Sequence, residues 1–138
     1  MRAPKNQGDR KVKRVIVAVQ NTLVSEAVVQ SLKKSDMLVE KTFGVAPDEI
    51  DVACRVFFAD VLFMDVTRFG GGSFDNRKKT AETVKKTNPK IKVCLVCDNV
   101  SDPELAFRVT NAKEMGIIDA FFYQSVPSDY IADFIATL

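Results

Sequence analysis

The sequence predicts an α/β fold: a three-layer (βα)5 sandwich around a five-stranded parallel sheet. Five strand-like segments alternate with five helix-like segments along most of the chain. The strand-like segments are short apolar runs, as expected for parallel strands that are buried on both faces. A length of 138 residues fits one such domain. Right-handed crossovers between parallel strands then place helices on both faces of the sheet.

The first half of the chain contains three strand patterns and two helix patterns. Residues 14–19 form a short β-branched strand, and residues 37–43 form a half-exposed strand that ends before Gly44. Between them, helical spacing predicts a buried helix face made of Val24, Ala27, Val28, Ser31 and Leu32. Pro47 opens a second helix with acids in its first turn, and its predicted inner face is Ile50, Ala53, Cys54 and Phe57. The third strand is the run of large apolar residues at 61–64.

The second half contains two strands and three helices. A third helix is predicted at residues 74–87, with Phe74, Ala81 and Val84 on one side and lysines on the other. Residues 91–97 form the fourth strand. A capping-box pattern at residues 101–104 begins a fourth helix that ends by Gly116. Residues 118–123 form the fifth strand, and a last helix is lined by Ile131, Phe134, Ile135 and Leu138.

Positive charge is concentrated at the N-terminus. Residues 1–14 hold six Lys or Arg and one acid, a net charge of +5, so the other 124 residues carry −3 of the total of +2. Residues 1–13 are expected to be a disordered basic leader, or alternatively a nucleic-acid-binding arm. The folded domain is expected at residues 14–138, and its mild acidity makes it a poor nucleic-acid surface.

The cysteines and the apolar runs indicate the cellular compartment of the protein and whether it binds a metal or a membrane. Cys54, Cys94 and Cys97 lie in apolar segments, which predicts reduced thiols in the core of a cytoplasmic protein. Cys94 and Cys97 have CxxC spacing, but on a strand they point to opposite faces. Because the chain has no histidine and no second cysteine pair, we expect no zinc or redox role. No apolar run approaches the roughly 18 residues of a membrane span, so no membrane association is expected.

The sequence lacks the motifs of several classes of nucleotide-binding proteins and enzymes that share this architecture. The turn Gln20-Asn21-Thr22 lacks the glycine fingerprint of dinucleotide-binding domains, and no Lys-Ser/Thr pair closes a glycine loop. Without histidine, the usual arrangements around a Ser or Cys nucleophile are excluded, and no enzymatic activity is expected. Gly70-Gly71-Gly72 indicates either a flexible loop or an anion-binding nest.

Asp65 is the most informative residue because it ends the third strand, at the edge of a parallel sheet where ligands collect. With this residue in that place, residues 14–138 resemble a receiver domain of two-component response regulators, which has a flavodoxin-like topology. The length, the (βα)5 order, the opening segment 14–24 and the passage 116–127 are also similar to that family. The resemblance implies that the third-strand Asp accepts a phosphoryl group in the presence of Mg²⁺. An acidic pair after the first strand holds the metal, and a Thr or Ser after the fourth strand and a Lys after the fifth contact the phosphoryl group.

Position by position, only the acceptor is retained. Asp65 matches the acceptor, whereas the acidic pair falls on Val19 and Gln20. The hydroxyl position falls on Cys97 and the lysine position on Gln124, while the family's aromatic position falls on Phe121. Mg²⁺ is a hard cation that needs carboxylate and phosphate oxygens, so these residues make a poor metal site. We therefore expect no metal or cofactor, with Mg²⁺ only if Asp65 is a working acceptor.

Three functional hypotheses follow. The favoured one is an atypical receiver: a signal-transduction module that works through protein interactions without phosphorylation, with Asp65 capping the loop after its strand through backbone N–H groups. The alternative is a conventional receiver in which a histidine kinase phosphorylates Asp65, with Arg68 or a nearby lysine offsetting the charge, and in which a DNA-binding output domain outside this chain responds. A third is a small-ligand domain with a pocket lined by Gln20, Asp65 and Cys97.

The partner surface is expected on the fourth helix, fifth strand and fifth helix, where the family forms homodimers. This region is rich in aromatic residues, most of which are expected in the core: Phe107, Phe122, Tyr123, Tyr130 and Phe134. One or two exposed rings among them would indicate an interface.

Overall fold

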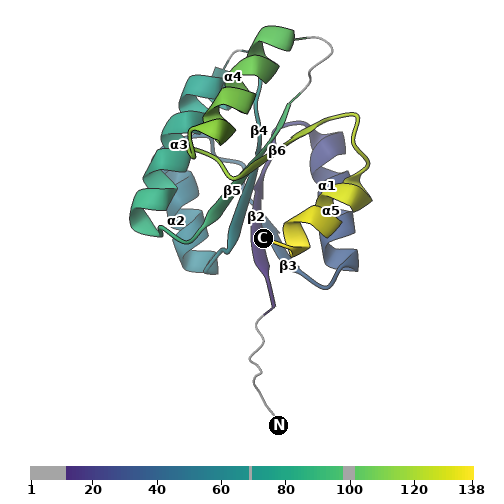
Figure 1. The fold of residues 1–138 in the computed structure, drawn as a ribbon. Coiled ribbons are helices and arrows are strands. Elements are labelled where there is room, and N and C mark those ends of the chain that lie inside the picture. Colours follow the sequence, from purple (N-terminus) through teal and green to yellow (C-terminus); the bar gives the residue numbers. More distant parts are fainter. Residues whose placement is uncertain (1–11, 69, 98–101) are drawn as a thin grey trace.

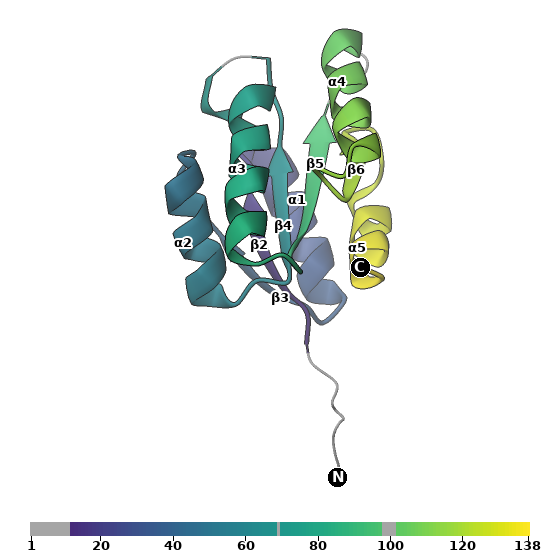
Figure 2. The same cartoon turned by 60° about the vertical axis from the view of Figure 1, so that its left-hand side comes forward.

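The computed structural model describes residues 12–68, 70–97 and 102–138 and confirms the predicted fold. A five-stranded parallel sheet runs through the middle in the order β3-β2-β4-β5-β6, with helices on both sides (Figures 1 and 2). The strands are β2 (Arg14–Ala18), β3 (Leu38–Lys41), β4 (Val61–Asp65), β5 (Lys92–Cys97) and β6 (Ala120–Tyr123).

The helices divide into two layers. They are α1 (Thr22–Lys34), α2 (Pro47–Phe57), α3 (Phe74–Thr87), α4 (Pro103–Glu114) and α5 (Ser128–Ala136). Helices α1 and α5 cover one face of the sheet, and α2, α3 and α4 cover the other (Figure 1). Each layer has its own apolar core, because successive side chains on a strand point to opposite faces.

Strand β4 lies at the centre of the sheet, between β2 and β5, and all five of its residues are buried. Leu62 and Met64 pack against the α2–α3–α4 layer, while Phe63 packs against the α1–α5 layer. Burial on both faces explains why the strand reads as an uninterrupted apolar run. Its last residue, Asp65, consequently enters a core environment.

The predicted inner face of α1 is wrong in one respect. Ala27 is exposed, whereas Ser25 and Val29 are buried beside Val28 and Leu32. Both stripes satisfy helical spacing, so the pattern alone could not choose between them. The choice is made by tertiary packing, because α1 packs against α5 as well as the sheet.

Helix α4 begins one residue later than a capping box at 101–104 predicts. Asp102 is the N-cap, and its carboxylate accepts a hydrogen bond from the Leu105 N–H at 3.1 Å. Ser101 lies outside the described residues. The helix ends at Glu114, before Gly116, whose φ of +79° is the left-handed conformation that favours glycine.

The predicted leader of residues 1–13 lies almost entirely outside the described residues. Its last residue, Lys13, belongs to the fold: its carbonyl accepts a hydrogen bond from the Leu38 N–H, at the start of β3. The Lys13 ammonium donates to the carbonyls of Ile135, Ala136 and Leu138 around the end of α5. A cation is favourable there because the carbonyl end of a helix is partially negative.

The cysteines lie in the core, and none of the three is in a disulfide. Cys94 faces the α1–α5 layer and Cys97 the opposite layer, so the predicted divergence of these side chains is confirmed. Among residues 12–68, 70–97 and 102–138, no cluster of three or more Cys, Asp or Glu could hold a metal ion. No helix in those ranges has the length and apolar character needed to cross a membrane.

The thiols should be inert in the native protein. Burial raises the pKa of Cys54 and of Cys94 to about 12, so both remain protonated at pH 8. We expect negligible reaction of the native chain with a disulfide reagent at pH 8, and reaction of three thiols after denaturation. In the Cys54→Ala variant, the number of thiols that react after denaturation should fall by one. Rapid reaction of any thiol in the native state would contradict this arrangement of the core.

Candidate functional site

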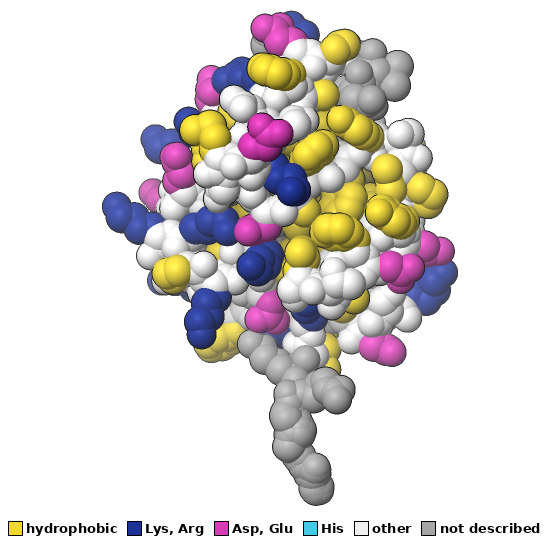
Figure 3. All heavy atoms as spheres, in the orientation of Figure 1, with side chains coloured by type: hydrophobic (Ala, Val, Ile, Leu, Met, Phe, Trp, Pro, Cys, Tyr) yellow, Lys and Arg dark blue, Asp and Glu magenta, His cyan; other side chains and the backbone are white. Residues whose placement is uncertain are grey.

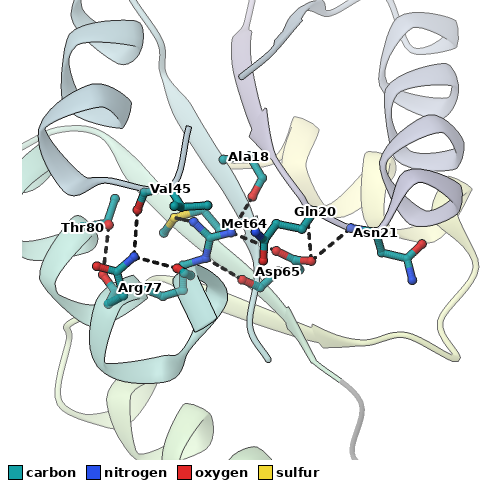
Figure 4. A network of polar contacts seen from close by, with 10 residues as sticks. Ala18, Gln20, Asn21, Val45, Met64, Asp65, Arg77 and Thr80 are labelled. Atoms are coloured by element: carbon teal, nitrogen blue, oxygen red, sulfur yellow. Dashed lines mark hydrogen bonds and ion pairs between the residues drawn. The ribbon is translucent and has the colours of Figure 1, made fainter. Parts of the chain in front are cut away.

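Asp65 lies at the carboxyl edge of the sheet, where β4 meets the loop that follows β2. Its side chain is almost completely buried, with the residue only 2% exposed. Oδ2 accepts hydrogen bonds from the Gln20 N–H at 3.1 Å and the Asn21 N–H at 3.4 Å (Figure 4). The expected backbone cap thus exists, but its donors belong to the β2–α1 loop and not to the loop after Asp65 itself. Parallel strands make this possible because their carboxyl ends share one edge.

Arg77 supplies the partner of Asp65 that sequence analysis missed. Its guanidinium extends from α3 to the carboxyl ends of β2 and β4, and the residue is only 1% exposed. Nη2 donates to Asp65 Oδ1 at 2.9 Å and to the Ala18 carbonyl at 3.0 Å. Nε donates to the Asp65 carbonyl at 2.8 Å, and Nη1 lies 3.7 Å from the Met64 sulfur (Figure 4). One side chain therefore ties α3 to both β2 and β4.

A signal for Arg77 is present in the sequence. Arg77 follows Phe74 by three residues and precedes Ala81 by four, so it belongs to the apolar stripe of α3. A charged residue in a lysine-rich helix is normally assigned to solvent, since Arg is rarely buried unless it is paired. The pairing depends on the carboxylate of Asp65 on strand β4, which the local sequence pattern of α3 does not show.

The pair is a buried ion pair in a mostly apolar setting. Burial lowers the pKa of Arg77, and the Asp65 carboxylate opposes that shift. The guanidinium nevertheless keeps its charge, because its pKa starts far above neutral. Both oxygens of Asp65 are engaged, one by the cation and one by two N–H groups. The carboxylate is thus neutralised from within the protein.

These surroundings do not fit Mg²⁺. Val19 is an apolar buried residue, and Gln20 contributes its backbone N–H, which is a donor and cannot ligate a cation. A divalent ion at Asp65 would also meet the positive charge of Arg77 2.9 Å from Oδ1. No metal-dependent step is therefore derived for this site.

The other predicted site residues lie along the same edge, but the structure brings only Gln20 into hydrogen-bond contact with Asp65. Cys97 ends β5 and is fully buried. Gln124 follows β6 with an exposed side chain, and its N–H donates to the Cys97 carbonyl at 2.9 Å. Phe121 is half-buried and packs edge-on against Tyr123, with ring centroids 5.7 Å apart.

The glycine segment after β4, predicted as a flexible loop or an anion-binding nest, forms a turn that packs against Val45. Gly70–Gly72 is a short 3-10 helix, η1, next to the Ser73 N-cap of α3. A side chain on Gly71 would lie 2.6 Å from a Val45 methyl group, so only glycine fits there. The Asn76 amide donates to the carbonyls of Val45 and Gly71, at 2.7 and 2.6 Å. These contacts fix the start of α3 and so position Arg77.

Arg68 points to a different acid. It forms a two-pronged pair with Asp102, with Nε–Oδ2 at 2.8 Å and Nη2–Oδ1 at 2.7 Å. This pair connects the β4–α3 loop to the N-cap of α4, and Arg68 makes no contact with Asp65. Arg68 or a nearby lysine was expected, in the conventional alternative, to offset the charge of a phosphorylated Asp65; the cation that contacts the unmodified Asp65 is Arg77.

The predicted partner surface presents exposed aromatic rings. Phe122 is buried and packs edge-on against Phe134 at 5.4 Å, as expected for the core. Phe107 on α4 is 70% exposed, and Tyr130 on α5 is also exposed. Hydrophobic side chains gather over the region of β6 and α5 in Figure 3. We refer to this region, with Phe107, Tyr130 and Phe134, as the aromatic face.

Solved receiver domains share this fold. An orphan response regulator of H. pylori matches with a TM-score of 0.71 and 13% identity, over 93% of this chain and 97% of its own. A CheY-like receiver domain protein from Methanospirillum hungatei matches with a TM-score of 0.67 and 18% identity, over 92% and 93%. A structure from a family of streptococcal redox sensors that evolved from two-component response regulators matches with a TM-score of 0.71 and 13% identity. The match covers 91% of this chain and 50% of that chain. No protein-family model matches the sequence, and no curated protein matches at a significant level.

These similarities establish the flavodoxin-like fold of receiver domains for this chain. At such identities they do not extend to the chemistry of Asp65, which rests on the side chains around it.

The Arg77–Asp65 pair should contribute strongly to stability. Arg77→Met leaves a buried carboxylate without its cation, so we expect a loss of about 3–5 kcal/mol in the free energy of unfolding. Removing both charges in Arg77→Met/Asp65→Leu should cost less than the sum of the single changes. Denaturant unfolding measures all of these values.

Arg108 provides a matched control, because its ion pair with Asp75 at 2.8 Å lies on the surface. Arg108→Met should cost at most about 1 kcal/mol. Equal losses for the Arg77 and Arg108 variants would contradict a structural role for the buried pair.

Proposed function

We propose that this chain is an atypical receiver that acts in signal transduction as a protein-interaction module, independent of phosphorylation. The observation that supports it is the Arg77–Asp65 pair. In this pair the residue at the acceptor position is buried and neutralised by a permanent cation. Phosphoryl transfer to Asp65 would require a free carboxylate oxygen, access for the donor and a metal to offset the added charge. Among the described residues, both Asp65 oxygens already accept hydrogen bonds, the residue is only 2% exposed, and neighbouring Val19 and Gln20 offer no carboxylate to a metal.

The same pair favours one conformation of the sheet edge. A phosphorylated Asp65 would need new partners for the added oxygens, but Gln124 offers an amide where a lysine would offer a charge. The Arg77 guanidinium instead binds carbonyls of β2 and β4 in the unmodified protein. Signals would then arrive through binding or assembly and not through a change of charge at Asp65.

The aromatic face is the surface we propose for assembly, with a second copy of the chain as the partner. Aromatic residues are enriched in interface cores, and Phe134, which is 37% exposed, packs edge-on against the buried Phe122. A DNA-binding role would come only through an output domain outside this chain. No kinase is required by this proposal, whereas the conventional alternative requires a histidine kinase for Asp65.

Phosphodonor treatment separates the proposal from the conventional alternative. Incubation with acetyl phosphate and Mg²⁺ should leave the intact mass of the chain at the level of the Asp65→Asn variant, because Asp65 is buried and paired. A conventional receiver domain treated in parallel shows that the reagent is active. A magnesium-dependent phosphoryl adduct in the wild type that disappears in Asp65→Asn would support the alternative.

Self-association should depend on the aromatic face. Phe107→Asp places a charge on the most exposed ring of the aromatic face, so we expect at least about a tenfold weaker dimer in sedimentation equilibrium. Val56→Asp is the matched control, because Val56 on α2 is as exposed as Phe107 and lies outside the aromatic face. Equal dimer affinity in both variants, or a monomeric wild type, would contradict assembly through this surface.

A further inference from the structure

A cavity of about 300 Å³ lies beside the Arg77–Asp65 pair, at the carboxyl ends of β2 and β3 and the start of α1. Its lining includes Gln20, Thr22, Ser25, Lys41, Phe43 and Arg77. It differs from the pocket that the sequence suggested, since neither Asp65 nor Cys97 lines it. The cavity thus lies at the carboxyl edge of the parallel sheet, where ligands of such sheets bind.

Two residues that line this cavity each have a buried hydrogen-bond donor without an oxygen acceptor in the part of the chain that the structure describes. Ser25 is only 4% exposed, and its hydroxyl makes no hydrogen bond there. Arg77 uses Nε and Nη2 for oxygen acceptors, but Nη1 contacts only the Met64 sulfur, a weak acceptor. Buried polar groups are normally hydrogen bonded, so two such donors around one cavity point to an oxygen-bearing ligand.

The remaining lining favours negative charge. Thr22 is the first residue of α1, a helix of 13 residues with no acid in its first turn. The N–H groups at such an end carry partial positive charge and bind carboxylates and phosphates. Lys41 is half-buried at the cavity, and its ammonium pairs with Glu26 at 3.1 Å. An anion in the cavity would share this ammonium with Glu26.

Phe43 adds a flat apolar surface. Its ring is 82% exposed although it lines the cavity, and the Lys41 ammonium lies 5.9 Å from its centroid. An exposed ring next to a cation suits a ligand that stacks a planar group and places an oxyanion nearby.

We propose that this cavity binds a small molecule in which a carboxylate or phosphate group adjoins a planar ring. The oxyanion accepts hydrogen bonds from Ser25 and the Arg77 Nη1, with Lys41 and the start of α1 opposing its charge. The ring lies against Phe43. This site stands on its own contacts and does not depend on whether Asp65 is phosphorylated.

Amide chemical-shift titration of the full chain tests the proposal with benzoate, adenosine monophosphate and benzyl alcohol. Benzoate and adenosine monophosphate should shift the amides of Thr22, Ser25 and Phe43, and benzyl alcohol, which has no charge, should bind at least about tenfold more weakly. Tighter binding of benzoate assigns the natural oxyanion to a carboxylate, and tighter binding of the nucleotide assigns it to a phosphate. No shift of these amides at about 10 mM of either anion would overturn the proposal.

Variants of the cavity complete the test. Ser25→Ala removes a hydroxyl that has no hydrogen-bond partner among the described residues, so the melting temperature should not fall while the affinity for the anions falls about tenfold. Lys41→Gln should weaken both anions and leave benzyl alcohol unchanged. Lys34→Gln, a surface change on the same helix as Ser25, is the control and should leave the affinity unchanged. Wild-type affinity in both Ser25→Ala and Lys41→Gln would refute the site.

Discussion

The buried ion pair between Arg77 and Asp65 is the interaction on which the carboxyl edge of the sheet depends. Through it, α3 contacts the ends of β2 and β4, and Asp65 in turn holds the N–H groups of Gln20 and Asn21. Two opposite charges can be buried here only together, since either one alone would lack compensation in the core. This mutual requirement makes the pair a constraint on the whole edge and not a local contact.

The constraint is supported by the turn before α3. Gly71 lets the chain pass close to Val45, and Asn76 bonds to carbonyls on both sides, so the helix begins where its fourth residue can reach the sheet edge. On the other side of the turn, the Arg68–Asp102 pair holds the N-cap of α4. The β4–α3 loop is therefore flanked by the Asp65–Arg77 pair and joined to the N-cap of α4 by the Arg68–Asp102 pair.

The cavity and the aromatic face are connected through α1 and α5. The cavity includes the start of α1, and further along that helix the Ser31 hydroxyl donates to Asp129 Oδ1 at 2.7 Å and lies 2.9 Å from the Ser128 hydroxyl, at the start of α5. Helix α5 carries Tyr130 and Phe134 of the aromatic face. A ligand that orders α1 would thus act on an element that contacts the proposed assembly surface. This path involves no change of charge at Asp65, so it is compatible with a receiver in which that residue is permanently paired.

The sequence by itself determined the order of strands and helices along the chain and the position of Asp65 at a strand end. It also determined that Val19 and Gln20 occupy the positions where receiver domains have an acidic pair. These are local properties, because apolar periodicity and residue identity do not depend on distant parts of the chain. Only the tertiary structure decided that Arg77 is buried, that Ser25 and not Ala27 faces inward, and that Phe107 is exposed while Phe122 is not. Each of these outcomes depends on an element far away in sequence. Arg77 is the clearest case: its charge can enter the core only because β4 brings a carboxylate within 2.9 Å.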